Sequence, residues 1–495
     1  KRPDNFLLYI NKTSLINTNM RQGAIVGAIQ KGGVALQEVI SSQLTEEGYL
    51  IRRERTYDEN TQVNYIYLDE TQESVQEKTI THPEWNKKDE HWQKYDNIIQ
   101  YLFKIIKFQE EYVVPAVEAL SEGIINRYEA MGALGAKELK RTAKLGAFTN
   151  PLFSQLFNFT YQLFFSLKAD IVADIAISHL KAGRKPIIAF KSTLESMLNY
   201  LVNDEGEKVK IGDKIRDDYS VILEKLLFST LRYREEHPDG TTIKFFNPED
   251  IGGDFAIVFK AIHNEIKKMK FGIPSSPIDY ILNKIRKAGY TNIEEITART
   301  RKLILSEKEG FVRIAPRKPV PVANIARMFQ NNEIDCLLIN QSGATGISLH
   351  ATREKTTLKT DADVKQRAMI IMQAELDINI EVQKRGRIFR TGQILYPIYE
   401  YVISSIPAEQ RLMMMLQRKL KSLDANVSSN QTQSKAMLEF PDFLNKYGDI
   451  VVAGWLKKHP RENQITGDLI KSEDGKEEIP HDLAYRASGR IALTD

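Results

Sequence analysis

Three side chains in the second half of the chain have the types and spacing of a phosphate-binding cluster. We expect a helix over Glu381–Arg390, which begins after a short apolar run. On that helix Gln383, Arg387 and Arg390 would occupy positions i, i+4 and i+7 of one face. The planar fork of arginine stabilises charge on a phosphoryl group in transfer, and Gly386 permits close approach of the backbone, so the face suits a triphosphate. The alternative is a solvated basic face that binds nothing.

A second candidate is the small-residue loop Gln341–Ser348, which follows an apolar run. Its small and hydroxyl-bearing members are Ser342, Gly343, Ala344, Thr345, Gly346 and Ser348. Such a loop brings backbone N–H groups close to a phosphate, helped by a helix N-terminus behind it. An ordinary tight turn can have the same composition, so that alternative stays open.

The elements that would position these residues alternate between strand and helix patterns. Short apolar runs predict buried parallel strands at Pro186–Phe190, Asp335–Asn340, Ala368–Met372 and Ile398–Ser404, with a weaker candidate at Ile293–Thr297. Ser276 and Pro277 form a serine cap and first turn that open a helix, and Gly289 ends it. This alternation predicts an α/β fold with a doubly wound parallel sheet. Ligands bind such sheets beyond the carboxyl ends of the strands.

The remaining segments differ in pattern. Gly32–Ile40 predicts the start of a helix, Gly48–Ile51 leads into a basic strand, and Asn64–Leu68 is another strand candidate. Residues 91–181 have apolar side chains at three- and four-residue spacing, which predicts mostly helices. The aromatic stretch Phe153–Phe165 within them is expected in the core. Ser192–Glu195 has capping-box spacing before a helical pattern.

Composition and pattern also predict the domain organisation. Residues 203–272 are charged and irregular, which indicates an insertion outside the sheet. We expect a connector at 1–90, a mainly helical segment at 91–182, the α/β domain at 183–427 with the insertion at 203–272, a polar linker at 428–434, and a helical C-terminal appendage at 435–495.

Composition excludes several classes of protein. The single cysteine, Cys336, excludes an intrachain disulfide and a cysteine-rich metal site, and it suits a reducing cytoplasm or nucleus. None of the eight histidines pairs at metal-ligand spacing, so no metal site is expected. No apolar run reaches the roughly 18 residues that a membrane span needs, and Lys1–Asn5 does not begin a signal peptide. The net charge of +4 is compatible with a polyanionic partner but too small to indicate one.

Taken together, the two candidate sites resemble a known pair of motifs. Gly343–Ser348 resembles motif V of superfamily 2 helicases, and Gln383–Arg390 fits motif VI, Q-x-x-G-R-x-x-R, without a mismatch. Their order is that of a second RecA-like domain. Lys191, Ser192 and Thr193 lie where motif IV should fall.

The resemblance narrows to strawberry-notch helicases, particularly their bacterial and phage members. It is carried by Ser276–Ile281, Ala288–Tyr290, Glu295–Thr297, Gly343–Ala351, Arg387–Gln393, Ile406–Arg411, Ser422–Asn426 and Phe443–Asp449. It spans nearly the whole chain and is weakest in 91–181 and 203–272. Ala298 stands where the family usually has glycine, which puts a backbone contact there in doubt, and Phe389 replaces a tyrosine or histidine.

The resemblance implies half of an ATP-driven nucleic-acid motor, with DNA as the expected substrate, in the cytoplasm of a bacterial or phage-infected cell. Arg387 and Arg390 would act as arginine fingers on the γ-phosphate, and Gln383 would position the nucleotide or the attacking water. Motif V would couple nucleotide state to strand contact through Gly343, Thr345, Gly346 and Ser348. Lys191, Ser192 and Thr193 would hold the nucleic-acid backbone without reading sequence.

The other half of an ATP site is missing from the sequence. A helicase needs a phosphate-binding G-K-[ST] loop and an acidic motif that binds magnesium. The chain contains no Gly-Lys-Ser or Gly-Lys-Thr, and Leu68–Thr71 is read as a strand end rather than the acidic motif. Lys1–Tyr9 resembles the segment after motif III, so a first RecA-like domain, in cis or as a separate chain, would supply the P-loop and the ligands of magnesium.

Two other classes of function are alternatives. A non-catalytic helicase-like binding or structural module, possibly phage-encoded, is favoured by the missing P-loop and disfavoured by the complete Gln383, Arg387 and Arg390 set. An attached nuclease or methyltransferase is remote, because neither terminal region has a paired-carboxylate motif or a glycine-rich cofactor fingerprint.

Overall fold

The chain folds into two compact units. Unit 1 consists of Lys1–Pro83, Gly183–Lys191 and Gly343–Asp495, and unit 2 consists of Glu84–Ala182 and Ser192–Ser342. The computed structural model describes residues 13–17, 21–49, 61–68, 90–130, 145–149, 152–191, 193, 209–237, 240–305, 310–318, 320–340, 346–373, 375–404, 406–427, 443–465, 469–470, 479–480 and 482–491.

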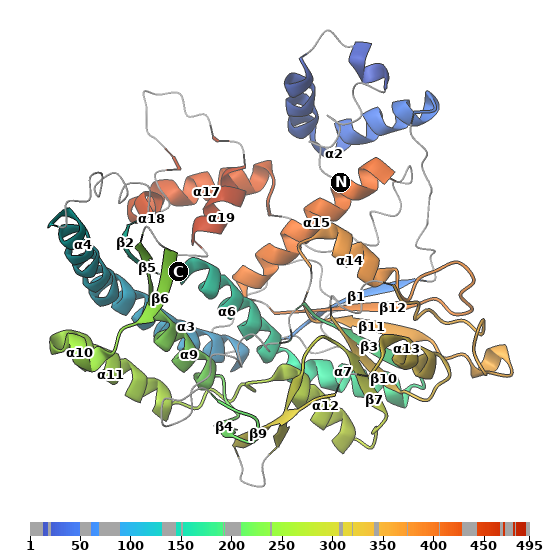
Figure 1. Ribbon diagram of the computed structural model, residues 1–495. Coiled ribbons are helices and arrows are strands. Elements are labelled where there is room, and N and C mark those ends of the chain that lie inside the picture. Colours follow the sequence, from blue (N-terminus) through green and yellow to red (C-terminus); the bar gives the residue numbers. More distant parts are fainter. Residues whose placement is uncertain are drawn as a thin grey trace. The chain divides into compact units, whose positions relative to one another are not determined.

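Unit 1 contains four parallel strands in the order β1-β12-β11-β3 (Figure 1). Their bounds are β1 (Gln62–Tyr67), β3 (Lys185–Ala189), β11 (Arg367–Ile371) and β12 (Ile398–Ile403). Every residue of β3, β11 and β12 is buried, as expected for parallel strands covered on both faces, whereas β1 is partly exposed. The central register aligns Ile370 with Ile188 on one side and with Glu400 on the other.

The described part of unit 1 also contains helices. They are α2 (Gln22–Glu46), α14 (Ile378–Arg385), α15 (Pro407–Val427), α17 (Lys446–Lys458), α18 (Pro460–Ile465) and α19 (Leu483–Ile491), with short 3-10 turns at Ser14–Asn17 and Asp361–Asp363. Helix α14 follows β11 and α15 follows β12, and α2 packs against α15. The α14 connection therefore leaves the carboxyl end of a central strand, where ligands bind in open α/β sheets.

Unit 2 combines helices with one parallel pair and two small antiparallel sheets. The parallel pair is β7 (Ile293–Ile296) and β10 (Cys336–Ile339). The sheets are β2 (Gly146–Thr149), β5 (Arg232–His237) and β6 (Gly240–Phe245), and β4 (Lys214–Arg216), β9 (Phe311–Pro316) and β8 (Arg301–Leu305). The helices are α3 (Glu90–Phe108), η3 (Gln109–Val113), α4 (Val114–Ala130), α6 (Leu152–Leu167), α7 (Ala169–Lys181), α9 (Ser220–Thr230), α10 (Pro248–Ile251), α11 (Gly253–Lys268), α12 (Pro277–Lys287) and α13 (Val322–Gln330).

Most of the elements expected from the sequence are present. The expected parallel strands are confirmed as β3, β7, β10, β11 and β12, and the candidate Asn64–Leu68 is β1. Residues 91–181 are mostly helical, and the core of unit 2 includes Phe159, Phe164 and Phe165 from the aromatic stretch. The expected α/β class is confirmed.

Two expectations about segments were wrong. Helix α2 begins at Gln22, ahead of the expected start at Gly32, so the two glycines there lie inside a helix. Residues 203–272 are regular where described: they contain β4, α9, β5, β6, α10 and α11. Their charge reflects partly exposed antiparallel strands and amphipathic helices rather than irregular structure. The described strands among them, β4, β5 and β6, pair antiparallel.

Other expectations lie outside the described residues. These are the strand after Gly48, the acidic pair Asp69 and Glu70, most of the capping box at Ser192–Glu195, and the polar linker at 428–434. The expected division into five segments stays a prediction.

Candidate phosphate site at the end of helix α14

Helix α14 contains Gln383, and the two predicted motif VI arginines follow the end of the helix. The helix begins after Asp377, whose side chain accepts a hydrogen bond from the N–H of Asn379 at 2.9 Å. This is an ordinary N-cap, which satisfies one of the donors at the helix start. The helix ends at Arg385, and Gly386 is its C-cap residue.

The helix expected over Glu381–Arg390 is therefore wrong at both ends. After Arg385 the backbone tightens, because the N–H of Arg387 bonds to the carbonyl of Lys384 at 3.1 Å, only three residues back. The carbonyl of Arg387 then accepts from the N–H of Leu349 at 2.8 Å instead of from a further helical turn. Arg387 and Arg390 consequently do not share a helical face with Gln383.

Both arginines converge on one backbone oxygen. The carbonyl of Ile347 accepts a hydrogen bond from Arg387 Nη1 at 2.8 Å and another from Arg390 Nη2 at 3.1 Å. Arg390 Nε also donates to the carbonyl of Gly386 at 3.1 Å. Because Ile347 lies within the predicted motif V, the tertiary structure brings the second half of that motif against the two arginines of motif VI.

The electrostatics of the pair fit an anion. The side chain of Arg387 is 8% exposed. Burial lowers its pKa, and the neighbouring charge of Arg390 lowers it further. An arginine remains protonated despite such a shift. Two close cations, one of them buried, repel each other, and an anion such as a phosphoryl group would relieve that repulsion.

The predicted motif V residues are only partly described. Gly346 is exposed and has a φ of 79°, in the left-handed region that favours glycine. Ser348 is partly buried, whereas Gly343 and Thr345 lie outside the described residues. The left-handed turn at Gly346 directly precedes the carbonyl that receives both arginines.

Gln383 and Lys191 belong to the same unit as the two arginines, whereas Thr193 belongs to unit 2. Gln383 is exposed on α14. Lys191 follows β3, is partly exposed, and donates its backbone N–H to Gln373 Oε1 at 3.0 Å. Thr193 is partly exposed, and Ser192 lies outside the described residues. Because β3 and β11 are paired, Lys191 and the connection to α14 leave the same edge of the sheet.

A buried ion cluster beneath α14 was not predicted. Glu381 is 0% exposed, and its carboxylate pairs with Lys384 Nζ at 3.2 Å and with Arg385 Nε at 3.3 Å. The hydroxyl of Tyr401 and the N–H of Glu375 also donate to it, at 2.9 and 3.1 Å. The signal was present in the sequence as charges at i, i+3 and i+4, but the same spacing occurs on many solvated helices.

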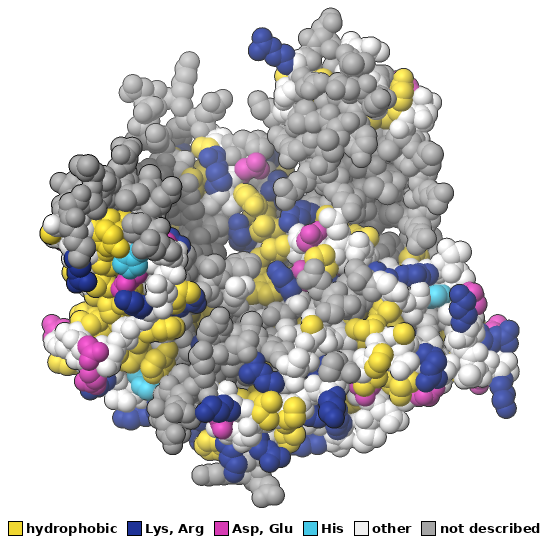
Figure 2. Space-filling model, in the orientation of Figure 1, with side chains coloured by type: hydrophobic (Ala, Val, Ile, Leu, Met, Phe, Trp, Pro, Cys, Tyr) yellow, Lys and Arg dark blue, Asp and Glu magenta, His cyan; other side chains and the backbone are white. Residues whose placement is uncertain are grey.

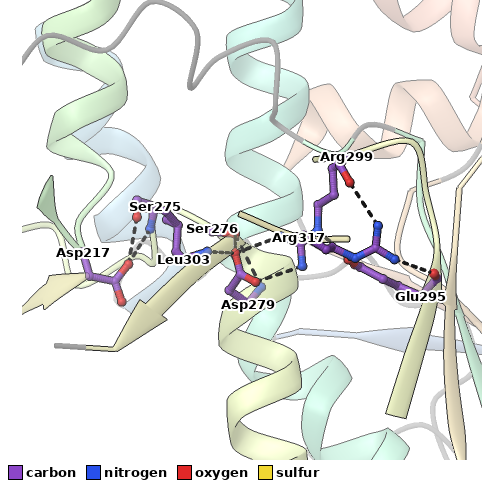
Figure 3. Close-up of polar contacts among 8 residues, drawn as sticks. All are labelled: Asp217, Ser275, Ser276, Asp279, Glu295, Arg299, Leu303 and Arg317. Atoms are coloured by element: carbon purple, nitrogen blue, oxygen red, sulfur yellow. Dashed lines mark hydrogen bonds and ion pairs between the residues drawn. The ribbon is translucent and has the colours of Figure 1, made fainter. Parts of the chain in front are cut away.

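A second buried ion network lies in unit 2, between α12 and the strands that follow (Figure 3). Arg299 donates from Nη1 and Nη2 to the two carboxylate oxygens of Asp279, both at 2.9 Å. Its Nε pairs with Glu295 at 2.8 Å, and Arg317 also pairs with Glu295. Asp279 accepts further hydrogen bonds from Ser276 Oγ at 2.8 Å and from the N–H of Leu303 at 2.9 Å.

This network explains a segment of the family resemblance. Ser276 and Asp279 close the first turn of α12, and Arg299 connects that turn to β7 through Glu295. Ala298, the departure from the family pattern, is exposed beside it. The charged groups of the network form hydrogen bonds and ion pairs with one another. We therefore interpret the network as a structural link between α12 and β7 rather than as a binding site.

The described residues contribute little else that would hold a ligand. Among them no group of three His, Cys, Asp or Glu side chains is placed to hold a metal ion. No described helix is long and apolar enough to cross a bilayer. On the face shown in Figure 2, described Lys and Arg side chains are interspersed with hydrophobic and uncharged ones and form no single continuous patch. Charge among the described side chains of this face therefore does not mark a nucleic-acid surface.

Parallel strands with connecting helices define an α/β domain, in which the arginine pair follows the helix after a central strand. In agreement with this, residues 276–473 match the family described as the C-terminal domain on Strawberry notch homologue. The chain therefore contains a helicase C-terminal domain of the strawberry notch type. The match covers both the Asp279 network and the site at the end of α14.

Relatives from animals are similar over 38% to 52% of this chain. Human protein strawberry notch homolog 1 is 27% identical over 199 residues, which are 38% of this chain and 13% of that protein. The rat homolog 1 is 27% identical over the same length, covering 15% of that protein. Protein strawberry notch of Drosophila melanogaster is 22% identical over 269 residues, which are 52% of this chain and 15% of that protein. The chain thus matches only about a seventh of the length of these relatives.

Proposed function

We propose that this chain is the C-terminal half of an ATP-dependent nucleic-acid helicase or translocase, with DNA as its expected substrate. Arg387 and Arg390 are the arginine fingers of an ATP site whose P-loop and magnesium ligands belong to a first RecA-like domain. The observation that carries the proposal is the convergence of both guanidinium groups on the carbonyl of Ile347. This contact joins the predicted nucleotide-sensing arginines to the predicted strand-coupling loop.

The chemistry required of this half is positioning and charge stabilisation. Phosphoryl transfer spreads negative charge over the γ-phosphate oxygens, and arginine forks stabilise that charge. The carbonyl of Ile347 holds both forks at one point, so they are ordered before a phosphate arrives. An anionic phosphate is a stronger acceptor than a neutral carbonyl and would draw the arginines from Ile347. The motif V backbone would then be released when the fingers engage.

The proposal also includes the residues to which the resemblance gives roles in nucleotide positioning and coupling: Gln383, Gly343, Thr345, Gly346 and Ser348. Gln383 positions the nucleotide or the attacking water, and the motif V residues couple nucleotide state to strand contact. Lys191, Ser192 and Thr193 contact the nucleic-acid backbone at the carboxyl end of β3. A cytoplasmic location and a bacterial or phage origin belong to the same proposal; the relatives reported above are animal proteins.

The test uses a two-domain protein, in which this chain is joined to a first RecA-like domain that carries a G-K-[ST] loop. We expect Arg387→Ala to lower the rate of ATP hydrolysis by about 10³-fold or more, because arginine fingers contribute on that order. The dissociation constant for a fluorescent oligonucleotide should change less than threefold. Arg353, an exposed arginine of unit 1 that pairs with Asp361 and with the carbonyl of Lys359, supplies the matched control Arg353→Ala. Unchanged hydrolysis in Arg387→Ala overturns the assignment of the finger.

A non-catalytic, helicase-like binding or structural module is the second candidate. The observation that favours it is the absence of Gly-Lys-Ser and Gly-Lys-Thr from the sequence. It predicts a two-domain protein that binds nucleic acid but hydrolyses no ATP. The same phosphate-release assay separates the two candidates.

A further inference from the structure

Gln373, which follows the end of β11, contacts both the segment after β3 and helix α14. Its side-chain oxygen Oε1 accepts the backbone N–H of Lys191 at 3.0 Å, and its main-chain carbonyl accepts Lys384 Nζ at 3.4 Å. Lys191 is in the proposed nucleic-acid segment after β3, whereas Lys384 is on α14, one turn before the arginines. Gln373 itself is 3% exposed, so its part of both contacts lies in the protein interior.

The contact with Lys384 continues into the buried cluster of α14. Lys384 pairs with Glu381, and Glu381 in turn pairs with Arg385. The carbonyl of Arg385 accepts the hydroxyl of Tyr399 at 2.9 Å, which ties the end of the helix to β12. All four side chains are buried. A continuous set of polar contacts therefore runs from the backbone of Lys191 to the turn where Arg387 leaves the helix.

Because these contacts are buried, a movement of Lys191 would be transmitted through them to α14. A buried donor or acceptor that loses its partner costs about 1–3 kcal/mol, so the groups move together rather than separately. The charge of Lys191 also reaches this cluster. Burial raises the pKa of Glu375, while the charges of Lys384 and Lys191 oppose that rise. A phosphate bound by Lys191 would change the field that α14 experiences.

We infer that Gln373 is a positioning residue that couples the nucleic-acid contact at Lys191 to the arginines at the end of α14. The inference rests on the proposed function, because it assigns a route between two of its sites. Gln373 lies between motifs V and VI in sequence and belongs to neither, so no motif points to it. Its role is visible only because β3 and β11 are neighbours.

The test compares ATP hydrolysis by the two-domain protein with and without saturating single-stranded DNA. Gln373→Met keeps the length and volume of the side chain but removes the acceptor for the Lys191 N–H. We expect the ratio of DNA-stimulated to basal hydrolysis to fall at least fivefold. Because DNA is saturating, a loss of affinity does not account for the fall. Gln373→Glu, which keeps an oxygen acceptor at the same reach, should retain at least half of the wild-type ratio.

Each outcome decides for or against the coupling role. A ratio within twofold of wild type in Gln373→Met overturns it. So does an equal loss of the basal and stimulated rates, which indicates only a damaged fold. If Gln373→Met does not fold, as judged by its melting temperature, Gln373→Asn replaces it, because its amide is too short to reach Lys191. A protein without DNA-stimulated hydrolysis overturns the proposed function as well, whereas loss of activity in Arg387→Ala with a normal ratio in Gln373→Met overturns this inference alone.

Discussion

The carboxylate of Glu381 is completely buried yet ionised. Burial by itself would raise its pKa, but the charges of Lys384 and Arg385 outweigh burial, and hydrogen bonds from Glu375 and Tyr401 add to their effect. Its pKa is consequently lowered from 4.5 to about 2. Removing one member of such a buried ion cluster leaves the others without compensation. Glu381 thus fixes the helix from which the two arginines emerge.

Glu381→Gln tests this role through the pH dependence of stability. The folded pKa lies below the unfolded one, so the stabilisation is present above about pH 4.5 and is lost as the pH falls toward 2. At pH 7 we expect the variant to be less stable by about 3–5 kcal/mol. Between pH 5 and pH 3 the wild type should lose more stability than the variant, as measured by urea unfolding. Parallel pH profiles for the two proteins would contradict the buried ionised state.

At the scale of elements, the loop from Gly346 to Leu349 and the end of α14 hold each other in place. The N–H of Leu349 bonds to the carbonyl of Arg387, and both arginines bond to Ile347. Arg367, fully buried on β11, donates to the carbonyl of Leu349 at 3.0 Å. The segment therefore depends on a core strand on one side and on the arginines on the other.

Gly346→Ala probes this arrangement through the backbone. A Cβ at Gly346 would meet no atom within 4 Å, so the only penalty is the φ of 79°, on the order of 1–2 kcal/mol. We expect slower ATP hydrolysis by the two-domain protein and faster hydrogen exchange of the Leu349 amide. Gly346→Asn should behave closer to wild type, because asparagine tolerates this conformation better.

Gly183 provides the matched control for that substitution. It has a φ of 74°, and a Cβ there also meets no atom within 4 Å, but it precedes β3 at the opposite end of the strand from Lys191. Gly183→Ala should therefore lower the melting temperature by a similar amount without slowing hydrolysis. An equal loss of hydrolysis in both variants would show that strain anywhere in unit 1 suffices, and that Gly346 has no special position.

At the scale of the whole molecule, the proposed function assigns one side of an ATP site to unit 1, and the sequence contains no Gly-Lys-Ser or Gly-Lys-Thr. We expect the 495-residue chain alone to release phosphate from ATP only at background rate, with or without DNA. Its affinity for DNA should fall steeply with salt, since backbone contacts release counterions. Mixing the chain with a separate first RecA-like domain should restore hydrolysis. Turnover by the chain alone that Arg387→Ala abolishes would show a complete site within it.

The strands and α12 could be predicted because their signals are local. A continuous apolar run such as Ile187–Phe190 is stable only when both of its faces are buried, and a parallel strand in a covered sheet is buried on both faces. The helix start at Ser276 can be predicted because the Ser276 hydroxyl accepts a hydrogen bond from the N–H of Asp279 and Pro277 suits the first turn. Both interactions involve residues close in sequence. The helicase C-terminal class was predicted from the resemblance of Gly343–Ser348 and Gln383–Arg390 to two helicase motifs, and that class is confirmed. The roles of the motif residues stay predictions.

What only the tertiary structure decided are contacts between residues distant in sequence. Local pattern favoured a longer helix through Arg390, but the N–H of Leu349, some forty positions earlier, takes the carbonyl that another turn would use. Whether the charges at Glu381, Lys384 and Arg385 meet water or each other depends on Tyr399 and Tyr401 of β12. The coupling position of Gln373 depends on which strand lies beside β11. The periodicity of apolar residues in a helix or strand predicts which of its faces is buried. It does not predict which element packs against that face. The reason is that the free energy of burial depends on the buried area and on the pairing of polar groups, not on the position of the partner in the sequence.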